Sequence, residues 1–227
     1  MVVISVLAQV ALALCIRAPA VAPARTPSSV GVIVITSPAR SHPNTEIIWS
    51  AIESLELLEG LSSAPITIVC DGCRPTALLD PAHAERLADR ISVDPCLFSK
   101  RGIVSDEVAA AYDNFQVQLE KEAAAHPTLA ARLSLLRLDS HHGFALAVRE
   151  GLLSCCRAGL KHALVMQHDR AFIRRLRLST LQGILDHFET QRACRYVGFP
   201  SGTSKLLASR ARDATTLNWL IRCHIVA

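Results

Sequence analysis

Short, continuous apolar runs recur along the chain and alternate with longer amphipathic stretches. A run without polar interruptions is typical of a strand that is buried on both faces of a parallel sheet. We predict five such strands, at residues 30–36, 65–70, 133–138, 164–168 and 194–199.

The stretches between these strands carry apolar residues at helical spacing. After the first strand, Asn44 or Thr45 can cap a helix whose apolar stripe extends from Ile48 to Leu58 and stops before Gly60. Similar stripes predict helices over residues 104–119, 144–159 and 178–188. Small residues on the face of the third helix should allow it to approach the sheet closely. Strand and helix in alternation predict one α/β domain over residues 28–227, a three-layer sandwich with a mostly parallel central sheet.

The first 27 residues differ from the rest. Residues 1–16 are apolar except for Ser5 and Gln9, but the run is shorter than the roughly twenty residues of a membrane span. An Ala/Pro-rich stretch with small residues suited to cleavage follows. We expect a signal or targeting segment at residues 1–27, which implies the secretory pathway (ER or Golgi lumen) and a route to membrane association. A plastid transit peptide, a short membrane anchor or a disordered tail of a cytoplasmic protein are the alternatives.

Composition and charge narrow the class of protein. The chain has 227 residues, of which half are apolar, and a net charge of +4, which fits one large globular domain. It contains no Lys-rich run and no alternation of basic and aromatic residues, so we expect no nucleic-acid partner. It also lacks the glycine-rich loops of dinucleotide dehydrogenases and P-loop ATPases.

The chain has eight cysteines, which are spread through apolar segments as buried free thiols would be. Only Cys70 and Cys73 form a C-x-x-C spacing. A structural zinc site would need a second ligand pair, and none occurs at ordinary spacing. A thioredoxin-like pair would open a helix, whereas Arg74-Pro75 follows here. A redox or metal protein using Cys70 and Cys73 is therefore a minor alternative.

Polar residues follow three of the predicted strands where each strand ends. Because the carboxyl ends of parallel strands meet at one edge of a sheet, a nucleotide would lie along that edge. Without a glycine-rich loop, a metal ion held by a carboxylate could offset the charge of a diphosphate. The polar pairs are Thr36 and Ser37, Asp71 and Gly72, and His168 and Asp169.

The order of these features resembles the glycosyltransferase A (GT-A) fold and its family 2-like glycosyltransferases. The matching pieces are the strand at residues 32–36, Ser54-Leu55 near a helix end, the strand and Asp-Gly at residues 66–72, the helix start from His141-His142-Gly143 to Gly151, and Gln167-His168-Asp169 at the Asp-x-Asp metal motif. The resemblance covers roughly residues 30–199. It departs from the family at Gln167, which replaces the first Asp of the metal motif, and at Arg149, where the family usually has Asn.

The resemblance implies a nucleotide-diphospho-sugar transferase. By that resemblance, Asp71 would contact the base or ribose, and Asp169 with His168 would hold Mg²⁺ or Mn²⁺. The implied donor-binding residues are Thr36, Ser37, Asp71, Gly72, Gly143 and Arg149. The expected function is metal-assisted transfer of a sugar, as in a hexosyltransferase, from a nucleotide-diphosphate sugar to an unidentified acceptor.

The part of the chain after Asp169 is short for an acceptor-binding region. Its acids Asp186, Glu189 and Asp213 include no convincing catalytic base. A catalytically inactive or truncated nucleotide-sugar-binding homologue is therefore the main alternative.

Three further features each have two interpretations. Asp169 could instead be the N-cap of a following helix. His141 and His142 could position a ligand or cap the helix that follows them. Four arginines follow Asp169, namely Arg170, Arg174, Arg175 and Arg177. They could bind a diphosphate or an anionic acceptor, but the favoured interpretation is that they lie on a solvated surface.

Overall fold

The computed structural model describes residues 2–5, 29–83, 85–87, 101–191 and 196–198. These residues form a six-stranded sheet in the order β6-β3-β2-β7-β1-β8, in which every neighbouring pair is parallel. This confirms an α/β fold with a mostly parallel central sheet. The strands are β1 (Val2–Ser5), β2 (Val30–Thr36), β3 (Ile66–Cys70), β6 (Leu133–Arg137), β7 (His162–Gln167) and β8 (Tyr196–Gly198).

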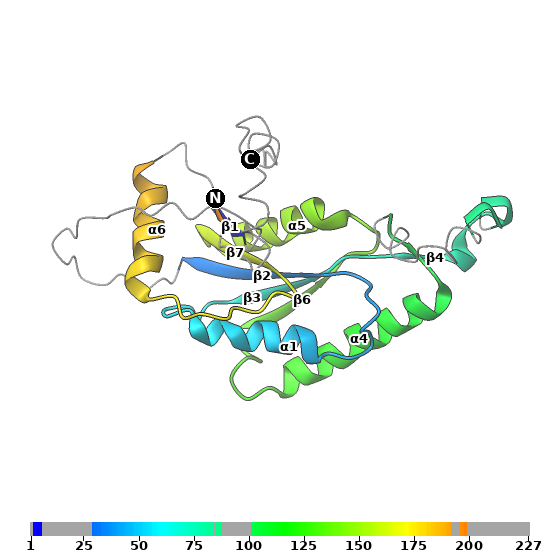
Figure 1. Ribbon diagram of the computed structural model, residues 1–227, viewed down its shortest axis with the longest axis horizontal. Helices are drawn as coiled ribbons and strands as arrows, with labels where there is room; N and C mark the ends of the chain where they lie inside the picture. The colour runs from blue at the N-terminus through cyan, green and yellow to red at the C-terminus, as the bar shows by residue number, and fades with distance from the viewer. Residues whose placement is uncertain (1, 6–28, 84, 88–100, 192–195, 199–227) are drawn as a thin grey trace.

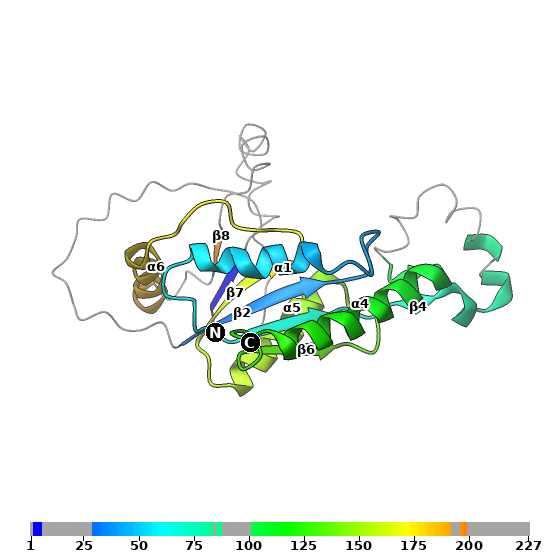
Figure 2. The same ribbon diagram turned by 90° about the horizontal axis from the view of Figure 1, so that it is seen from below.

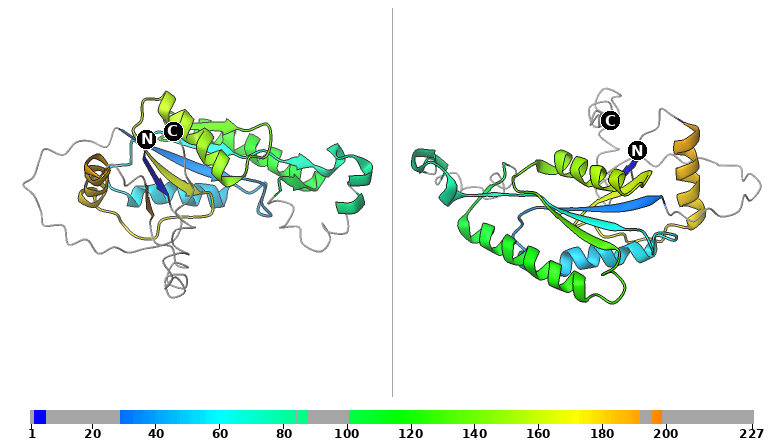
Figure 3. Two further views of the ribbon diagram at one scale, coloured as in Figure 1. Left: turned by 90° about the horizontal axis from the view of Figure 1, so that it is seen from above. Right: turned by 180° about the vertical axis from the view of Figure 1, so that it is seen from behind.

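Helices cover both faces of the sheet (Figures 1 and 3). From β2 the chain steps to β3 and β6 on one side, and then crosses back to β7 on the other side of β2. Because such crossovers are right-handed, the reversal moves the connecting helix to the opposite face. The helices are α1 (Glu46–Glu53) with the 3₁₀ turn η1 (Ser54–Leu57), α4 (Asp106–Ala125) on the same face, α5 (Gly143–Arg157) on the other face, and α6 (Leu178–Thr190).

A second, two-stranded sheet pairs β4 (Arg74–Pro75) with β5 (Ile103–Val104). It lies at the end of the molecule away from α6, together with the 3₁₀ turn η2 (Thr76–Leu78) (Figure 2).

The core forms two layers, one on each side of the sheet. All seven residues of β2 are buried, as the continuous apolar run predicts. Val32 and Val34 pack with α1 and α4, whereas Ile33 and Ile35 pack with α5. The central strand is therefore shielded from water on both faces.

Helix α5 packs closely against the sheet at Gly151. A Cβ atom at Gly151 would be 2.6 Å from Cγ2 of Ile33 and 3.1 Å from Cγ2 of Val69. The prediction that small residues allow this approach is confirmed.

Most of the predicted elements differ from the structure by a few residues in their bounds, and Val104, predicted in the second helix, belongs to β5 instead. Strand β7 begins at His162 rather than Leu164, because His162 pairs with Val30 and is buried. The first helix stops at Glu53 and continues only as the 3₁₀ turn η1.

At the N-terminus, Val2–Ser5 forms β1, between β7 and β8. Residues 6–28 lie outside the described part, so the signal or targeting segment stays a prediction. In the part of the chain that the structure describes, no helix is long and apolar enough to cross a membrane.

Candidate functional site

The polar ends of β3, β2 and β7 lie side by side at one edge of the sheet. Asp71 N donates to Thr36 O at 2.9 Å, and His168 N donates to Ile35 O at 3.0 Å. Asp71, Thr36 and His168 therefore follow one another along this edge. We call the site formed by these three residues and Asp169 the carboxyl edge. The strand order reverses between β2 and β7, and ligands of open α/β sheets bind at such a reversal.

Asp71 fastens the start of α5 to the end of β3. Its side chain is only 2% exposed, Oδ1 accepts from His142 N at 2.7 Å, and Oδ2 accepts from Gly143 N at 2.9 Å. His141 Nδ1 lies 2.9 Å from Oδ2, without the alignment of a hydrogen bond. A carboxylate at this position also suits the positive end of the helix dipole. Both oxygens of Asp71 and the N–H of Gly143 are thus already engaged within the protein.

Gly72 allows the loop after β6 to pass directly over the end of β3. A Cβ atom at Gly72 would lie 2.5 Å from Leu138 O and 2.7 Å from Ser140 N. Both contacts are with backbone atoms, which cannot move aside as a side chain can. The glycine is therefore needed for packing at the carboxyl edge.

Oγ1 of Thr36 and Nε2 of His42 are buried and have no hydrogen-bond partner among the described residues. Thr36 is 1% exposed and His42 is 8% exposed. Nδ1 of His42 accepts from Ala39 N at 3.1 Å, so the ring proton belongs on Nε2. Burial, and then the neighbouring His168, lower the pKa of His42 to about 4, so its ring is neutral at pH 7.

Aromatic residues of α4 hold His42 in place. Its ring stacks on Phe115 at a centroid distance of 4.0 Å and on Tyr112 at 5.0 Å. The Tyr112 hydroxyl donates to Thr36 O at 3.4 Å, which connects this cluster with the end of β2. Sequence reasoning missed His42 and treated Tyr112 and Phe115 as a helix stripe only. No local signal marks His42, because its burial depends on α4.

His168 and Asp169 differ in environment. Burial lowers the pKa of His168, although the adjacent Asp169 opposes this shift, and the His168 ring lies 6.1 Å from that of His42. The Asp169 side chain is 52% exposed, with Arg170 Nε at 3.7 Å. Asp169 lies in a turn and is not a helix N-cap, since α6 begins only at Leu178.

The carboxyl edge offers only part of a metal-binding set. A neutral imidazole and a carboxylate can both ligate a divalent ion. Within the described ranges, however, no three His, Cys, Asp or Glu residues are grouped so that they could hold one. Mg²⁺ often takes one or two carboxylates from the protein and its other ligands from water and substrate phosphates. His168 and Asp169 thus fit an ion that arrives with a phosphate ligand better than a preformed centre.

Arg149 lies on the solvent-exposed surface of α5. Its side chain is 57% exposed on α5, and its Nη1 bonds to Glu150 Oε1 at 2.8 Å. Ser37 directly follows Thr36 and is partly exposed.

After Asp169 the chain runs away from the carboxyl edge, and it takes most of the arginines with it. Phe172 N donates to Ser54 Oγ at 2.8 Å, and Leu176 N donates to Leu57 O at 2.9 Å. Ser54 and Leu57 lie beyond the end of α1, near the opposite edge of the sheet.

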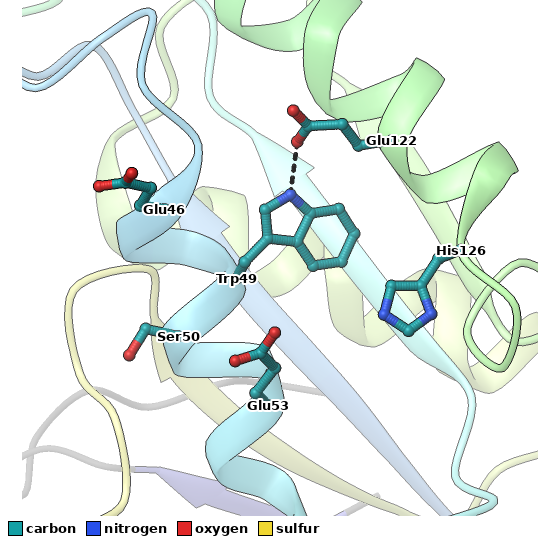
Figure 4. A pocket seen from close by; sticks show the side chains of 6 residues that line it. All are labelled: Glu46, Trp49, Ser50, Glu53, Glu122 and His126. Atoms are coloured by element: carbon teal, nitrogen blue, oxygen red, sulfur yellow. Dashed lines mark hydrogen bonds between the residues drawn. The ribbon is translucent and has the colours of Figure 1, made fainter.

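A hollow of about 400 Å³ lies elsewhere, on the outer surface of α1 and α4 (Figure 4). Trp49 Nε1 donates to Glu122 Oε2 at 2.6 Å, and the indole stacks on His126. The other lining residues are Glu46, Ser50 and Glu53. Sequence reasoning did not find this hollow, which two helices build together.

The cysteine pair has no activated thiol. Cys70 is 1% exposed, and burial raises its pKa to about 12. Burial also raises the pKa of the half-buried Cys73, and neither residue forms a disulfide. Reactive cysteines have a lowered pKa, so these environments argue against redox chemistry.

No model of a known protein family matches the chain, and neither a curated protein nor a solved structure matches it. The case for a function therefore rests on the residues and the geometry described above.

Proposed function

We propose that the protein binds a nucleotide-diphosphate sugar at the carboxyl edge and acts as a GT-A-like glycosyltransferase. The observation that carries this proposal is the reversal of strand order between β2 and β7. It brings Thr36 beside His168 and Asp169 at the position where open α/β sheets bind ligands. The order of the surrounding elements also supports it, through the resemblance of residues 30–199 to family 2-like glycosyltransferases.

In this proposal Asp169 and His168 hold Mg²⁺ or Mn²⁺ together with the phosphate oxygens of the donor. The ion would stabilise negative charge on the departing nucleoside diphosphate. Asp71 would act indirectly, because its carboxylate fixes the start of α5 beside the site.

Binding without turnover is the second candidate, and the carboxylates favour it. Among the described acids at the carboxyl edge, Asp71 is engaged with α5 and Asp169 is assigned to the metal. Asp186 on α6 accepts a hydrogen bond from Gln182, and Glu189 is exposed near the end of that helix. We assign no catalytic base.

Calorimetric titration with a panel of nucleoside diphosphates, with and without Mn²⁺, tests the site. We expect binding that Mn²⁺ strengthens, and Asp169→Asn should remove this strengthening. Asp186→Asn makes the same chemical change on α6 and should bind as the wild type does. Failure of the wild type to bind any nucleotide would overturn the proposal.

Release of free nucleoside diphosphate from a nucleotide sugar separates the two candidates. Metal-dependent release that Asp169→Asn abolishes would indicate an enzyme. Binding with no release from any donor in the panel would instead indicate a nucleotide-sugar-binding protein.

A further inference from the structure

Residues 170–177, which we call the basic strap, connect β7 with α6 along the surface of α1 (Figure 1, yellow segment leading to α6). The strap is fastened at two points. Near its start, Phe172 N donates to Ser54 Oγ. Near its end, Leu176 N donates to Leu57 O, and Glu59 N donates to Leu176 O at 3.0 Å. The residues between these points form a short, anchored tip.

The tip presents an apolar side chain to solvent. Phe172 and Leu176 pack against the core, whereas Ile173 is 85% exposed, more than any other large apolar residue in the described ranges. Burial of an isoleucine is favourable, so an anchored segment gains nothing for folding by holding one in water.

The strap is also strongly basic. Two of its arginines have long ion pairs, Arg170 with Asp169 at 3.7 Å and Arg175 with Glu59 at 3.9 Å. Arg174 and Arg177 form no ion pair with any residue in the described part of the chain. All four arginines are exposed, so the strap keeps an excess of positive charge around Ile173.

We propose that the basic strap docks on a membrane surface that contains anionic phospholipids. Ile173 enters the boundary between headgroups and acyl chains, and the arginines contact lipid phosphates. An acidic polypeptide would satisfy the arginines but would leave the solvent-exposed isoleucine unexplained. One apolar side chain and a few charges give weak, reversible attachment. The proposal is independent of the donor site, because the tip lies away from the carboxyl edge.

Sedimentation of the full chain with lipid vesicles tests this proposal. We expect binding to vesicles of phosphatidylcholine with about 30% phosphatidylserine, little binding to phosphatidylcholine alone, and release at high salt. Arg174→Ser with Arg175→Ser should weaken the binding about 25-fold, since each basic residue near an anionic surface contributes roughly fivefold. Ile173→Ser should weaken it by a smaller factor.

Matched variants distinguish binding through the basic strap from binding through the overall positive charge of the protein. Arg157→Ser with Lys161→Ser removes the same charge from the end of α5 and the turn after it, and should leave binding unchanged. Arg174→Lys with Arg175→Lys keeps the charge and should retain most of it. Equal binding to both kinds of vesicle, or an equal loss in the variant at Arg157 and Lys161, would overturn the proposal. Binding to polyglutamate without binding to vesicles would also overturn it and assign the strap to an acidic protein.

Discussion

At the scale of single residues, Asp71 connects two segments that are distant in the sequence. Its carboxylate accepts from the backbone N–H groups of His142 and Gly143, which lie 71 and 72 residues further along the chain. His142 is the N-cap residue of α5, but its side chain makes no capping hydrogen bond. The carboxylate of Asp71 takes that role instead. The residue thereby positions α5 beside the candidate site.

Asp71→Ala should therefore destabilise the protein, because it leaves two N–H groups near the carboxyl edge without their acceptor. We expect a loss of about 2–3 kcal/mol in the free energy of unfolding, measured with urea. Asp71→Asn keeps one acceptor oxygen and should lose less. The exposed Asp139 is the control, and its change to alanine should cost no more than about 0.5 kcal/mol. Equal effects of the two alanine variants would contradict the capping role.

His42 should make stability depend on pH. Its folded-state pKa is about 4, whereas the ordinary value is 6.5. As pH falls below 6.5, His42 becomes protonated in the unfolded chain, whereas in the folded protein it stays neutral until about pH 4. The free energy of unfolding therefore decreases over this range. The difference between the two pKa values corresponds to about 3 kcal/mol.

His42→Phe keeps an aromatic ring against Tyr112 and Phe115 but cannot titrate. Its free energy of unfolding, measured by urea denaturation between pH 7 and about 4, should therefore fall less steeply than that of the wild type. His162 and His168 also have a lowered pKa, so the difference between the two curves is the informative quantity. Parallel curves would show that His42 does not carry this dependence.

At the scale of elements, the distance of α5 from the sheet depends on Gly151. Alanine is favoured over glycine inside a helix by about 1 kcal/mol. The added Cβ would nevertheless lie 2.6 Å from the Ile33 side chain in a closely packed core. We expect steric repulsion to win, because strand β2 and helix α5 cannot separate without opening their shared core.

Gly151→Ala should thus destabilise the protein by about 1–3 kcal/mol, measured by chemical denaturation. In the Gly151→Ala background, Ile33→Ala should cost less than it does in the wild type, because it removes the clashing side chain. A stabilised Gly151→Ala variant, or strictly additive effects, would contradict this account of the packing.

At the scale of the whole molecule, protection from water should decrease from the centre of the sheet outwards. Strand β2 is buried along its whole length and hydrogen-bonded on both sides, by β3 and β7. The turn η2 at the far end has no buried residue. The global stability of the fold therefore depends mainly on the three central strands.

Hydrogen exchange measured by mass spectrometry should show this gradient. We expect amides of β2, β3 and β7 to exchange only through global unfolding, and those of residues 76–83 to exchange much faster. Exchange in β2 at the rate of residues 76–83 would contradict the assignment of β2 as the central strand.

The hydrophobic pattern by itself determined the class of the fold and most of its elements. The predicted strand at residues 30–36 coincides with β2, and the predicted helix from residue 104 corresponds to α4, because burial imposes its period locally. The polar strand ends also identified the candidate edge in advance, since parallel strands must present their carboxyl ends together.

Only the tertiary structure decided what surrounds those polar residues. It engaged Asp71 with α5, left Arg149 in solvent, and buried His42 against Tyr112 and Phe115. It also led the basic strap away from the edge that Asp169 occupies. These contacts join residues far apart in the chain, and they depend on strand order and on the face each helix covers. A local pattern predicts which segments are buried, but the packing of distant elements decides which residues their side chains meet.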